Sequence, residues 1–207
     1  MSSAESESQT QTKTMWVFAY GAMLWKEDLP FLQKITGCIT GYVRRFWVAS
    51  DDYQCFPNKR GRVVALVRTG CPRDMVWGAT YEIDKQNEAS VASEPEFFGR
   101  AGFAKRTATF YPVLTKRAQF TSHVKPFDIT LYVATDNNSC FKRNEPLNVT
   151  ASCIANAHGP NGSNAEYLYN LAAEMRLIAP NYEDHHLYPL ESAVKKIIAE
   201  REASVDL

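Results

Sequence analysis

Short apolar runs, rich in Val, Ile, Phe, Tyr and Trp, occupy the first two thirds of the chain and are separated by polar stretches that contain Gly and Pro. This composition and spacing are typical of strands joined by turns. Residues 38–50 carry paired arginines, which predict a strand with one end facing solvent. Residues 84–93 (DKQNEASVAS) predict a short helix that ends before Pro95. The predicted strands lie at residues 15–20, 38–50, 62–68, 77–83, 107–114 and 127–135.

Past residue 136 the apolar residues recur at helical spacing. Helices are predicted at residues 149–157, 165–177 and 188–200, the last with Leu190, Val194 and Ile197 on one face. Strands come first and helices after, without βαβ alternation or an internal repeat. The pattern therefore predicts an α+β fold whose sheet is mostly antiparallel or mixed and strongly curved. Closure of that sheet into a small barrel is compatible with the strand spacing but is not required by it.

Composition indicates one domain and a small substrate. The 207 residues are 45% apolar, and 23 Lys and Arg balance 23 Asp and Glu. No overall field therefore draws the protein to nucleic acid or to an anionic membrane. Residues 1–14 are small and polar and predict a disordered tail, which leaves residues 15–207 as a single domain. No segment resembles a signal peptide or a membrane span, so we expect a cytoplasmic protein.

The cysteines and histidines do not form a recognisable metal site. Five cysteines are scattered without a CxxC pair, which predicts reduced thiols and no zinc site. The sequence EDHH at residues 183–186 lacks a third ligand at metal spacing, and we interpret it as a solvated first turn of a helix. A nucleophilic pair of Cys140 or Cys153 with His123 or His158 stays open, although nothing marks either thiol as activated.

The loop HGPNGSN at residues 158–164 leads into a predicted helix. It lacks the Lys-Ser/Thr of a phosphate-binding loop, which makes nucleotide binding a weak alternative. Ser163 or Asn164 is suited to the N-cap position. Helix capping is therefore the preferred interpretation.

The run MWVFAYGAMLW at residues 15–25 stops abruptly at Tyr20, Gly21 and Ala22. Gly21 has no Cβ, so the backbone can approach a ligand closely and direct N–H groups at a negatively charged oxygen. One glycine after one strand is equally compatible with an ordinary turn.

A second candidate lies in SEPEFF at residues 93–98. Glu96 precedes two phenylalanines, and apolar surroundings raise the pKa of a carboxyl group toward the range useful for proton transfer. A solvated glutamate at a helix end is the alternative from this feature alone.

Seven segments in order resemble one family, the ChaC-type glutathione-specific γ-glutamylcyclotransferases. The resemblance runs from about residue 15 to about residue 190. The matching segments are WVFAYGAMLW, YVRRFWVAS, GRVVALV, VWGATYEI, TATFYPV, LYVAT followed by DN, and HGPNGSNAEYLYNLA.

The resemblance implies a small mixed β-barrel flanked by helices and a lyase that works without metal or cofactor. In that reaction the α-amine of the γ-glutamyl group attacks its own γ-carbonyl, and glutathione yields 5-oxoproline and Cys-Gly. Such a reaction needs a base, a folded substrate and donors for the oxyanion. The family's loop, which wraps the γ-glutamyl group with backbone N–H groups, matches here at Ala19, Tyr20, Gly21, Ala22, Met23 and Leu24.

The chain departs from the family pattern at the loop and at the base. Ala22 replaces the usual Ser, which removes a hydroxyl and keeps the N–H. The ChaC pattern FREKGGY, aligned without gaps, places Gly99 on the catalytic glutamate, whereas the broader cyclotransferase pattern places Glu96 there. Phe103 replaces a tyrosine in both registers. We assign the base to Glu96 because its spacing to Phe103 fits the second pattern, and Glu94 is the reserve candidate.

Two other functions stay open. Gly99 and Ala22 favour a catalytically silent relative that binds a γ-glutamyl ligand or a protein partner. The same chemistry could also act on another γ-glutamyl donor. The sequence leaves the oligomeric state open.

Overall fold

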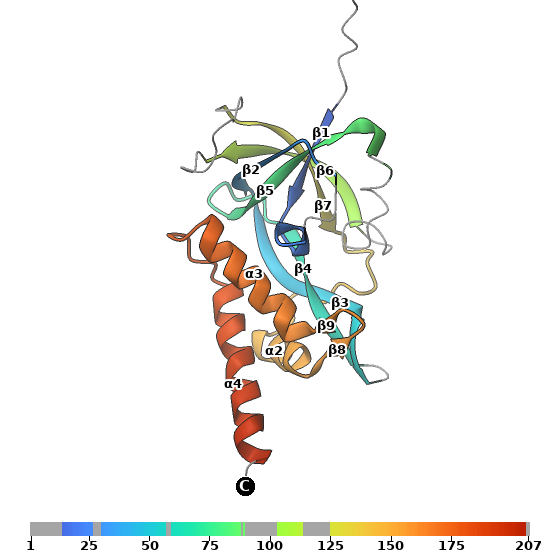
Figure 1. Ribbon diagram of the computed structural model, residues 1–207, viewed down its shortest axis with the longest axis vertical. Helices are drawn as coiled ribbons and strands as arrows, with labels where there is room; N and C mark the ends of the chain where they lie inside the picture. Colours follow the sequence, from blue (N-terminus) through green and yellow to red (C-terminus); the bar gives the residue numbers. More distant parts are fainter. Residues whose placement is uncertain are drawn as a thin grey trace, which may run out of the picture.

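The computed structural model describes residues 14–26, 30–56, 59–87, 89, 103–113 and 125–205. Within these residues five strands close into a barrel (Figure 1). Their order is β1 (Thr14–Ala19), β5 (Met75–Asp84), β2 (Gln33–Thr40), β6 (Phe103–Pro112) and β7 (Phe127–Ala134). Neighbours are antiparallel except β7 and β1, which close the barrel in parallel where Val17 pairs with Thr130. The expected mixed, curved sheet is thus confirmed, and it closes.

Two glycines opposite each other let so small a barrel close around aromatic rings. Gly37 of β2 pairs with Gly78 of β5. A Cβ on Gly37 would lie 2.6 Å from Cζ of Phe110, and one on Gly78 would lie 2.8 Å from Cζ of Phe18. The two rings lie 5.9 Å apart between their centroids and are fully buried. The missing side chains therefore provide the space that the rings fill.

A long hairpin, β3 (Tyr42–Phe56) with β4 (Lys59–Arg68), leaves the barrel toward the helices. The single strand predicted at 38–50 is wrong near its start, because β2 ends at Thr40 and β3 begins at Tyr42. Gly41 between them has φ +81°, a conformation that glycine adopts without the steric penalty of a side chain. The residues on both sides are β-branched and favour a strand, so the hydrophobic pattern predicts one continuous strand and no turn.

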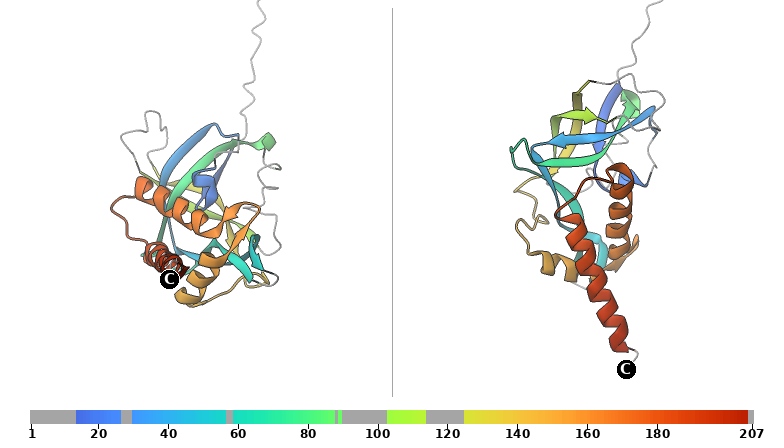
Figure 2. Two further views of the ribbon diagram at one scale, coloured as in Figure 1. Left: turned by 60° about the horizontal axis from the view of Figure 1, so that its bottom comes forward. Right: turned by 90° about the vertical axis from the view of Figure 1, so that its left-hand side faces the viewer.

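In the described chain three helices lie to one side of the barrel, beside the hairpin, and α3 is the one nearest the barrel (Figure 2). They are α2 (Leu147–Asn156), α3 (Asn164–Ile178) and α4 (Leu187–Val205), close to the predicted positions. One apolar core continues from Val17 and Phe18 in the barrel to Leu168 and Leu190 in the helices. In the described part of the chain, no helix combines the length and hydropathy needed to cross a membrane.

Two shorter predictions are met only in part. The helix predicted at residues 84–93 starts as a 3-10 turn, η2 (Lys85–Asn87), and most of its remainder lies outside the described residues. Strand β1 begins at Thr14, one residue inside the predicted tail, and the rest of the tail lies outside the described residues.

The loop before α3 forms a small hairpin of β8 (His158–Gly159) and β9 (Gly162–Ser163). The Ser163 hydroxyl accepts a hydrogen bond from the N–H of Ala165, which confirms Ser163 as the N-cap.

A buried polar network ties the hairpin to the helices. The Arg62 guanidinium donates two 2.7 Å hydrogen bonds to the Glu145 carboxylate, which also accepts one from the Thr150 hydroxyl. The Asn164 side chain accepts from the Arg62 N–H and donates to the Arg62 carbonyl. Burial alone raises the pKa of Glu145, but the bonds from Arg62 and Thr150 outweigh it and hold that pKa below its usual value. Strand β4 is therefore fixed against the start of both α2 and α3.

Gly78→Ala should destabilise the fold. The new Cβ would lie 2.3 Å from the Ala19 carbonyl oxygen as well as against the Phe18 ring, so backbone must move. Overpacking of this kind costs about 1–3 kcal/mol, measurable as a lower midpoint in urea unfolding. Thr107→Ala on the exposed face of β6 is the control and should change stability by less than about 0.5 kcal/mol. Equal stability of Gly78→Ala and wild type would contradict the packing account.

Candidate active site

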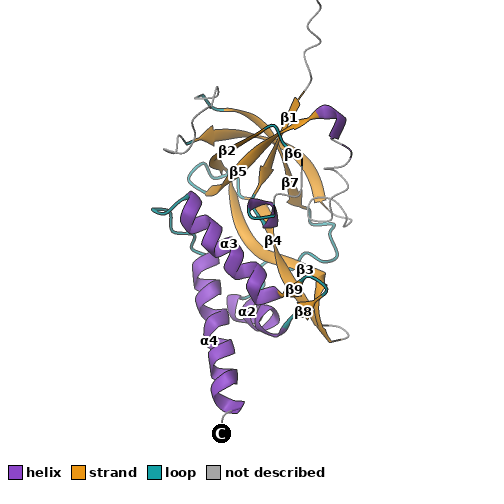
Figure 3. Ribbon diagram, in the orientation of Figure 1, coloured by secondary structure: helices purple, strands orange, loops and turns teal. Residues whose placement is uncertain are grey.

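The six residues predicted to bind substrate form one buried turn between the barrel and α3. Strand β1 ends at Ala19, and a 3-10 turn, η1 (Ala22–Leu24), follows Gly21 (Figure 3, the short purple turn below the barrel). Tyr20, Ala22, Met23 and Leu24 are each less than a tenth exposed. The structure thus brings the predicted residues together away from bulk solvent.

Tyr20 fixes the start of the turn to the barrel. Its hydroxyl donates a 2.8 Å hydrogen bond to the carbonyl oxygen of Tyr132 in β7. Its ring stacks on Phe18, with 6.4 Å between centroids. Because β7 also closes the barrel against β1, this bond holds the turn at the closing seam.

Gly21 is pressed between β4 and α3. A Cβ at this position would lie 2.9 Å from Cγ1 of Val64 and 3.2 Å from the hydroxyl oxygen of Tyr167. The Tyr167 ring also packs edge-on against Trp25 and Phe46, at 5.4 and 6.0 Å between centroids. The close approach that Gly21 permits is therefore, in this structure, an approach to protein side chains.

Tyr167 belongs to the candidate site, although no sequence pattern marks it. It lies at an apolar position of α3 and is 7% exposed, so its local pattern is that of any core residue of a helix. Only the fold places its hydroxyl beside Gly21.

The hydrogen bonds of the turn leave its first N–H groups without an internal acceptor. The first bond within the turn runs from the Leu24 N–H to the Gly21 carbonyl, at 3.0 Å. The N–H groups of Gly21, Ala22 and Met23 precede it, and the start of any helical turn lacks carbonyls for such groups. A substrate oxygen could therefore accept hydrogen bonds from this backbone.

The candidate bases lie outside the described residues, and so does Gly99. The first described residue after them is Phe103, which opens β6 and pairs with Ala134 of β7. Ala134 lies two residues beyond Tyr132, the partner of the Tyr20 hydroxyl. The chain thus re-enters the barrel at the end where the turn lies, seven residues after Glu96.

The EDHH segment is not a solvated helical turn, and that prediction is wrong for Asp184 and His186. Both are more than nine-tenths buried, and all four residues precede α4. One Asp184 oxygen accepts hydrogen bonds from the N–H groups of His186 and Leu187, while the other faces a guanidinium nitrogen of Arg44 at 3.5 Å. Arg44, expected near a solvent-facing strand end, is buried with it. Among the described residues no three His, Cys, Asp or Glu side chains gather as metal ligands.

His186 satisfies a backbone group that the sheet leaves unpaired. The pairing of β3 with β4 shifts between Arg45 and Val48, and within this irregularity the Phe46 N–H donates to Nε2 of His186 at 3.0 Å. Burial is the main cause that lowers the pKa of His186 to about 4, and the positive charge of Arg45 acts in the same direction. The imidazole is therefore neutral at physiological pH and serves the fold.

The remaining candidates are the cysteines and histidines outside the EDHH segment. Cys140 places its sulfur 3.5 Å from a guanidinium nitrogen of Arg60, and its N–H donates to the Asn138 side chain. His158 is exposed on β8, and His123 lies outside the described residues. The contacts described for Cys140 thus give no support to a Cys–His pair.

A closed five-stranded barrel with helices to one side and a buried Tyr-Gly turn after its first strand is the architecture expected of γ-glutamylcyclotransferase-like proteins. A model of the family described as ChaC-like protein matches residues 15–197. The chain belongs to this ChaC-like family, as the seven segments predicted.

Relatives of known function share most of their length with this chain. The glutathione-specific gamma-glutamylcyclotransferase 1 of Mus musculus is 32% identical over 190 residues, which cover 90% of this chain and 80% of the relative. The protein of the same name from Danio rerio is 31% identical over 87% of this chain and 89% of its own length. The crystal structure of a glutathione-specific γ-glutamylcyclotransferase from yeast superposes with a TM-score of 0.77 at 23% identity. That superposition covers 90% of this chain and all of the yeast chain, and it establishes the shared fold.

Acid should destabilise the protein through His186. The folded chain binds the imidazole proton only near pH 4, whereas the unfolded chain binds it near pH 6.5. The unfolded state therefore takes up more protons in this window, so the contribution is complete above pH 6.5 and is lost as pH falls to about 4. It amounts to about 3 kcal/mol. The measurement is the free energy of urea unfolding between pH 4 and 7.

His186→Gln is the control, since its amide oxygen can accept the Phe46 N–H and does not titrate. Its unfolding free energy should fall less steeply with acid than that of wild type. Parallel curves for the two proteins would contradict the assignment.

Proposed function

We propose that this protein is a glutathione-specific γ-glutamylcyclotransferase, a lyase that converts glutathione to 5-oxoproline and Cys-Gly. The observation that carries the proposal is the buried turn at residues 20–24, in a chain whose relatives are named for this activity. The substrate is a small molecule, in keeping with the balanced charge of the chain. We place the reaction in the cytoplasm and assign no role to nucleic acid or membrane.

The turn would hold the γ-glutamyl group and receive the developing negative charge. Its N–H groups at Gly21, Ala22 and Met23 have no acceptor within the turn. They would donate to oxygens of the γ-glutamyl group, including the γ-carbonyl oxygen as it becomes an oxyanion. Donors fixed in advance stabilise such a charge without reorganising during the reaction. Folding the substrate also brings its α-amine against the γ-carbonyl carbon.

Glu96 would transfer the proton. Its carboxylate takes a proton from the α-ammonium group, and the free amine attacks the γ-carbonyl carbon to form the ring C–N bond. As the tetrahedral intermediate collapses, the γ-amide C–N bond breaks, and Glu96 returns the proton to the leaving nitrogen of Cys-Gly. The ring nitrogen carries two hydrogens after the attack, and it gives the second proton to the freed Glu96 carboxylate, which passes it to the Cys-Gly amine. Proton and acyl transfer account for every bond, so the scheme uses no metal or cofactor.

Chain topology supports the choice of this segment for the base. β6 opens at Phe103 at the barrel end that carries the turn, because Phe103 pairs with Ala134 and the Tyr20 hydroxyl binds Tyr132. Glu96 precedes Phe103 by seven residues and Glu94 by nine. Both glutamates therefore belong to the chain that leads directly into that end of the barrel, and Glu94 remains the reserve candidate.

A second candidate function is ligand binding without turnover. In the alignment without gaps, Gly99 occupies the position of the family's catalytic glutamate, and Ala22 lacks the hydroxyl of the usual Ser. A chain with the turn and without the base would hold a γ-glutamyl compound or a protein partner. Cyclisation of a γ-glutamyl donor other than glutathione is the remaining alternative.

Purified protein incubated with glutathione should release 5-oxoproline and Cys-Gly in equal amounts. Glu96→Gln should lower this release at least about a hundredfold, as expected on loss of a general base, with an unchanged unfolding midpoint. Glu94→Gln is the matched control and should retain activity. Assays with a γ-glutamyl amino acid and a γ-glutamylamine in parallel define the donor.

The outcomes separate the alternatives. Turnover by Glu96→Gln and loss by Glu94→Gln would move the base to the reserve candidate. Binding of glutathione without release of either product would favour the silent relative.

Ala22→Ser should tighten substrate binding. The side chain is 2% exposed, and the added hydroxyl restores the donor that the family usually carries. One hydrogen bond contributes about 0.5–1.5 kcal/mol, which corresponds to a fall in KM of roughly twofold to twelvefold. Steady-state kinetics check this, with urea unfolding as a measure of fold. A higher KM in a variant of unchanged stability would contradict the claim that a hydroxyl at position 22 donates to the substrate.

A further inference from the structure

Two side chains bind consecutive carbonyl groups at the far end of the turn. The Tyr81 hydroxyl donates a 2.8 Å hydrogen bond to the Met23 carbonyl oxygen. The Lys34 ammonium group donates to the next carbonyl, that of Leu24, at 3.4 Å. The turn is thus held at its carbonyl end by groups from the barrel, opposite the N–H groups assigned to substrate.

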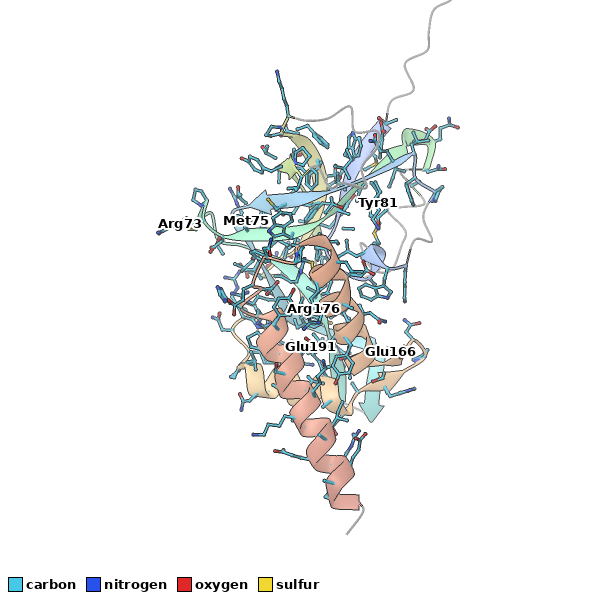
Figure 4. The ribbon with its side chains drawn as sticks, turned by 60° about the vertical axis from the view of Figure 1, so that its left-hand side comes forward. Arg73, Met75, Tyr81, Glu166, Arg176 and Glu191 are labelled. Carbon is cyan, nitrogen blue, oxygen red and sulfur yellow. The ribbon has the colours of Figure 1, made fainter. Side chains whose placement is uncertain are left out.

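Tyr81 and Lys34 act from adjacent strands in fixed register. Lys34 of β2 pairs directly with Tyr81 of β5, and paired residues place their side chains on the same face of a sheet. The Lys34 Nζ lies 5.3 Å from the centre of the Tyr81 ring, and Phe31 packs edge-on against that ring at 5.1 Å. Tyr81 is 1% exposed and Lys34 half-buried; Figure 4 labels Tyr81 among the side chains of the barrel.

These contacts bear on the orientation of the peptide groups from Gly21 to Trp25. The Leu24 N–H binds the Gly21 carbonyl, and the N–H groups of Trp25 and Lys26 bind the Ala22 carbonyl. A donor on the Met23 carbonyl therefore fixes the peptide that also carries the Leu24 N–H. Because hydrogen bonds in series polarise one another, a hydroxyl and an ammonium group at the carbonyl end strengthen the donors at the other end.

We propose that Tyr81 and Lys34 are positioning residues for the cyclotransferase reaction. Neither touches the substrate; they hold the peptide groups of residues 20–24 in the geometry that binds the γ-glutamyl group. This inference rests on the proposed function for its effect on catalysis. Its effect on the turn itself is independent of that function.

The kinetic test compares Tyr81→Phe with Tyr182→Phe. Both remove a hydroxyl that donates to a backbone carbonyl, at 2.8 Å to Met23 and at 2.7 Å to Met75 respectively, but only the first lies at the turn. Tyr81→Phe should lower kcat/KM for glutathione about tenfold, the loss of one well-formed hydrogen bond, with KM raised and kcat lowered because the turn binds both the γ-glutamyl group and the developing oxyanion. Tyr182→Phe should change neither constant by more than about twofold.

Lys34 provides a rescue test. Lys34→Met removes the charged donor while keeping much of the stem, and should raise KM about threefold. Lys34→Arg should restore KM to within about twofold of wild type, because the guanidinium also donates to carbonyls and stacks on tyrosine. If Lys34 acted only by packing, Lys34→Met and Lys34→Arg would change KM by the same factor.

Amide hydrogen exchange tests the turn without substrate. In Tyr81→Phe the N–H groups of Leu24, Trp25 and Lys26 should exchange at least about tenfold faster, while the amides of β7 keep their rates. Unchanged exchange at these three amides, or an equal fall of kcat/KM in Tyr182→Phe, would overturn the inference. If the wild-type protein releases no 5-oxoproline, the proposed function is refuted. Faster amide exchange in Tyr81→Phe would then still support the positioning of the turn by Tyr81.

Discussion

The turn at residues 20–24 is held by hydrogen bonds and packing from the barrel, the hairpin and α3, and the candidate site depends on this confinement. β7 binds the Tyr20 hydroxyl, while Val64 and Tyr167 close over Gly21. β5 and β2 bind the carbonyl end through Tyr81 and Lys34. A short turn in water would sample many conformations, and confinement by five elements removes that freedom. The N–H groups are therefore aimed before a ligand arrives, which is the condition for efficient electrostatic stabilisation.

Buried ion pairs hold the hairpin strands β3 and β4 in place beside that turn. Arg62 and Glu145 hold β4, which carries Val64, against the helices through two hydrogen bonds of 2.7 Å. Arg44 and Asp184 join β3 to the start of α4 at the longer distance of 3.5 Å, and burial lowers the pKa of Arg44. Loss of one partner from such a pair leaves a buried charge that costs several kcal/mol, on the order of 3–5. These pairs therefore fix how the hairpin packs against the starts of α2 and α4.

The strands and helices followed from sequence wherever apolar spacing was regular, as in α3 and β7. The same reading failed at Gly41, because β-branched neighbours concealed a turn inside an apolar run. It also failed at Arg44, Asp184 and His186, whose burial depends on residues 140 positions apart meeting in space. The Tyr20 turn was predictable from its glycine and from the family pattern. Tyr167 and Tyr81 were not, since no local signal separates a core tyrosine from one that holds a site.

The claim that the turn binds the γ-glutamyl group is tested most directly by an amide-resolved NMR titration. Glutathione would be added to uniformly ¹⁵N-labelled Glu96→Gln, in which turnover is expected to be slow enough to observe binding. The account predicts that the amides of Gly21, Ala22 and Met23 shift most and saturate together. Saturable shifts confined to other parts of the chain, with these three amides unmoved, would contradict it.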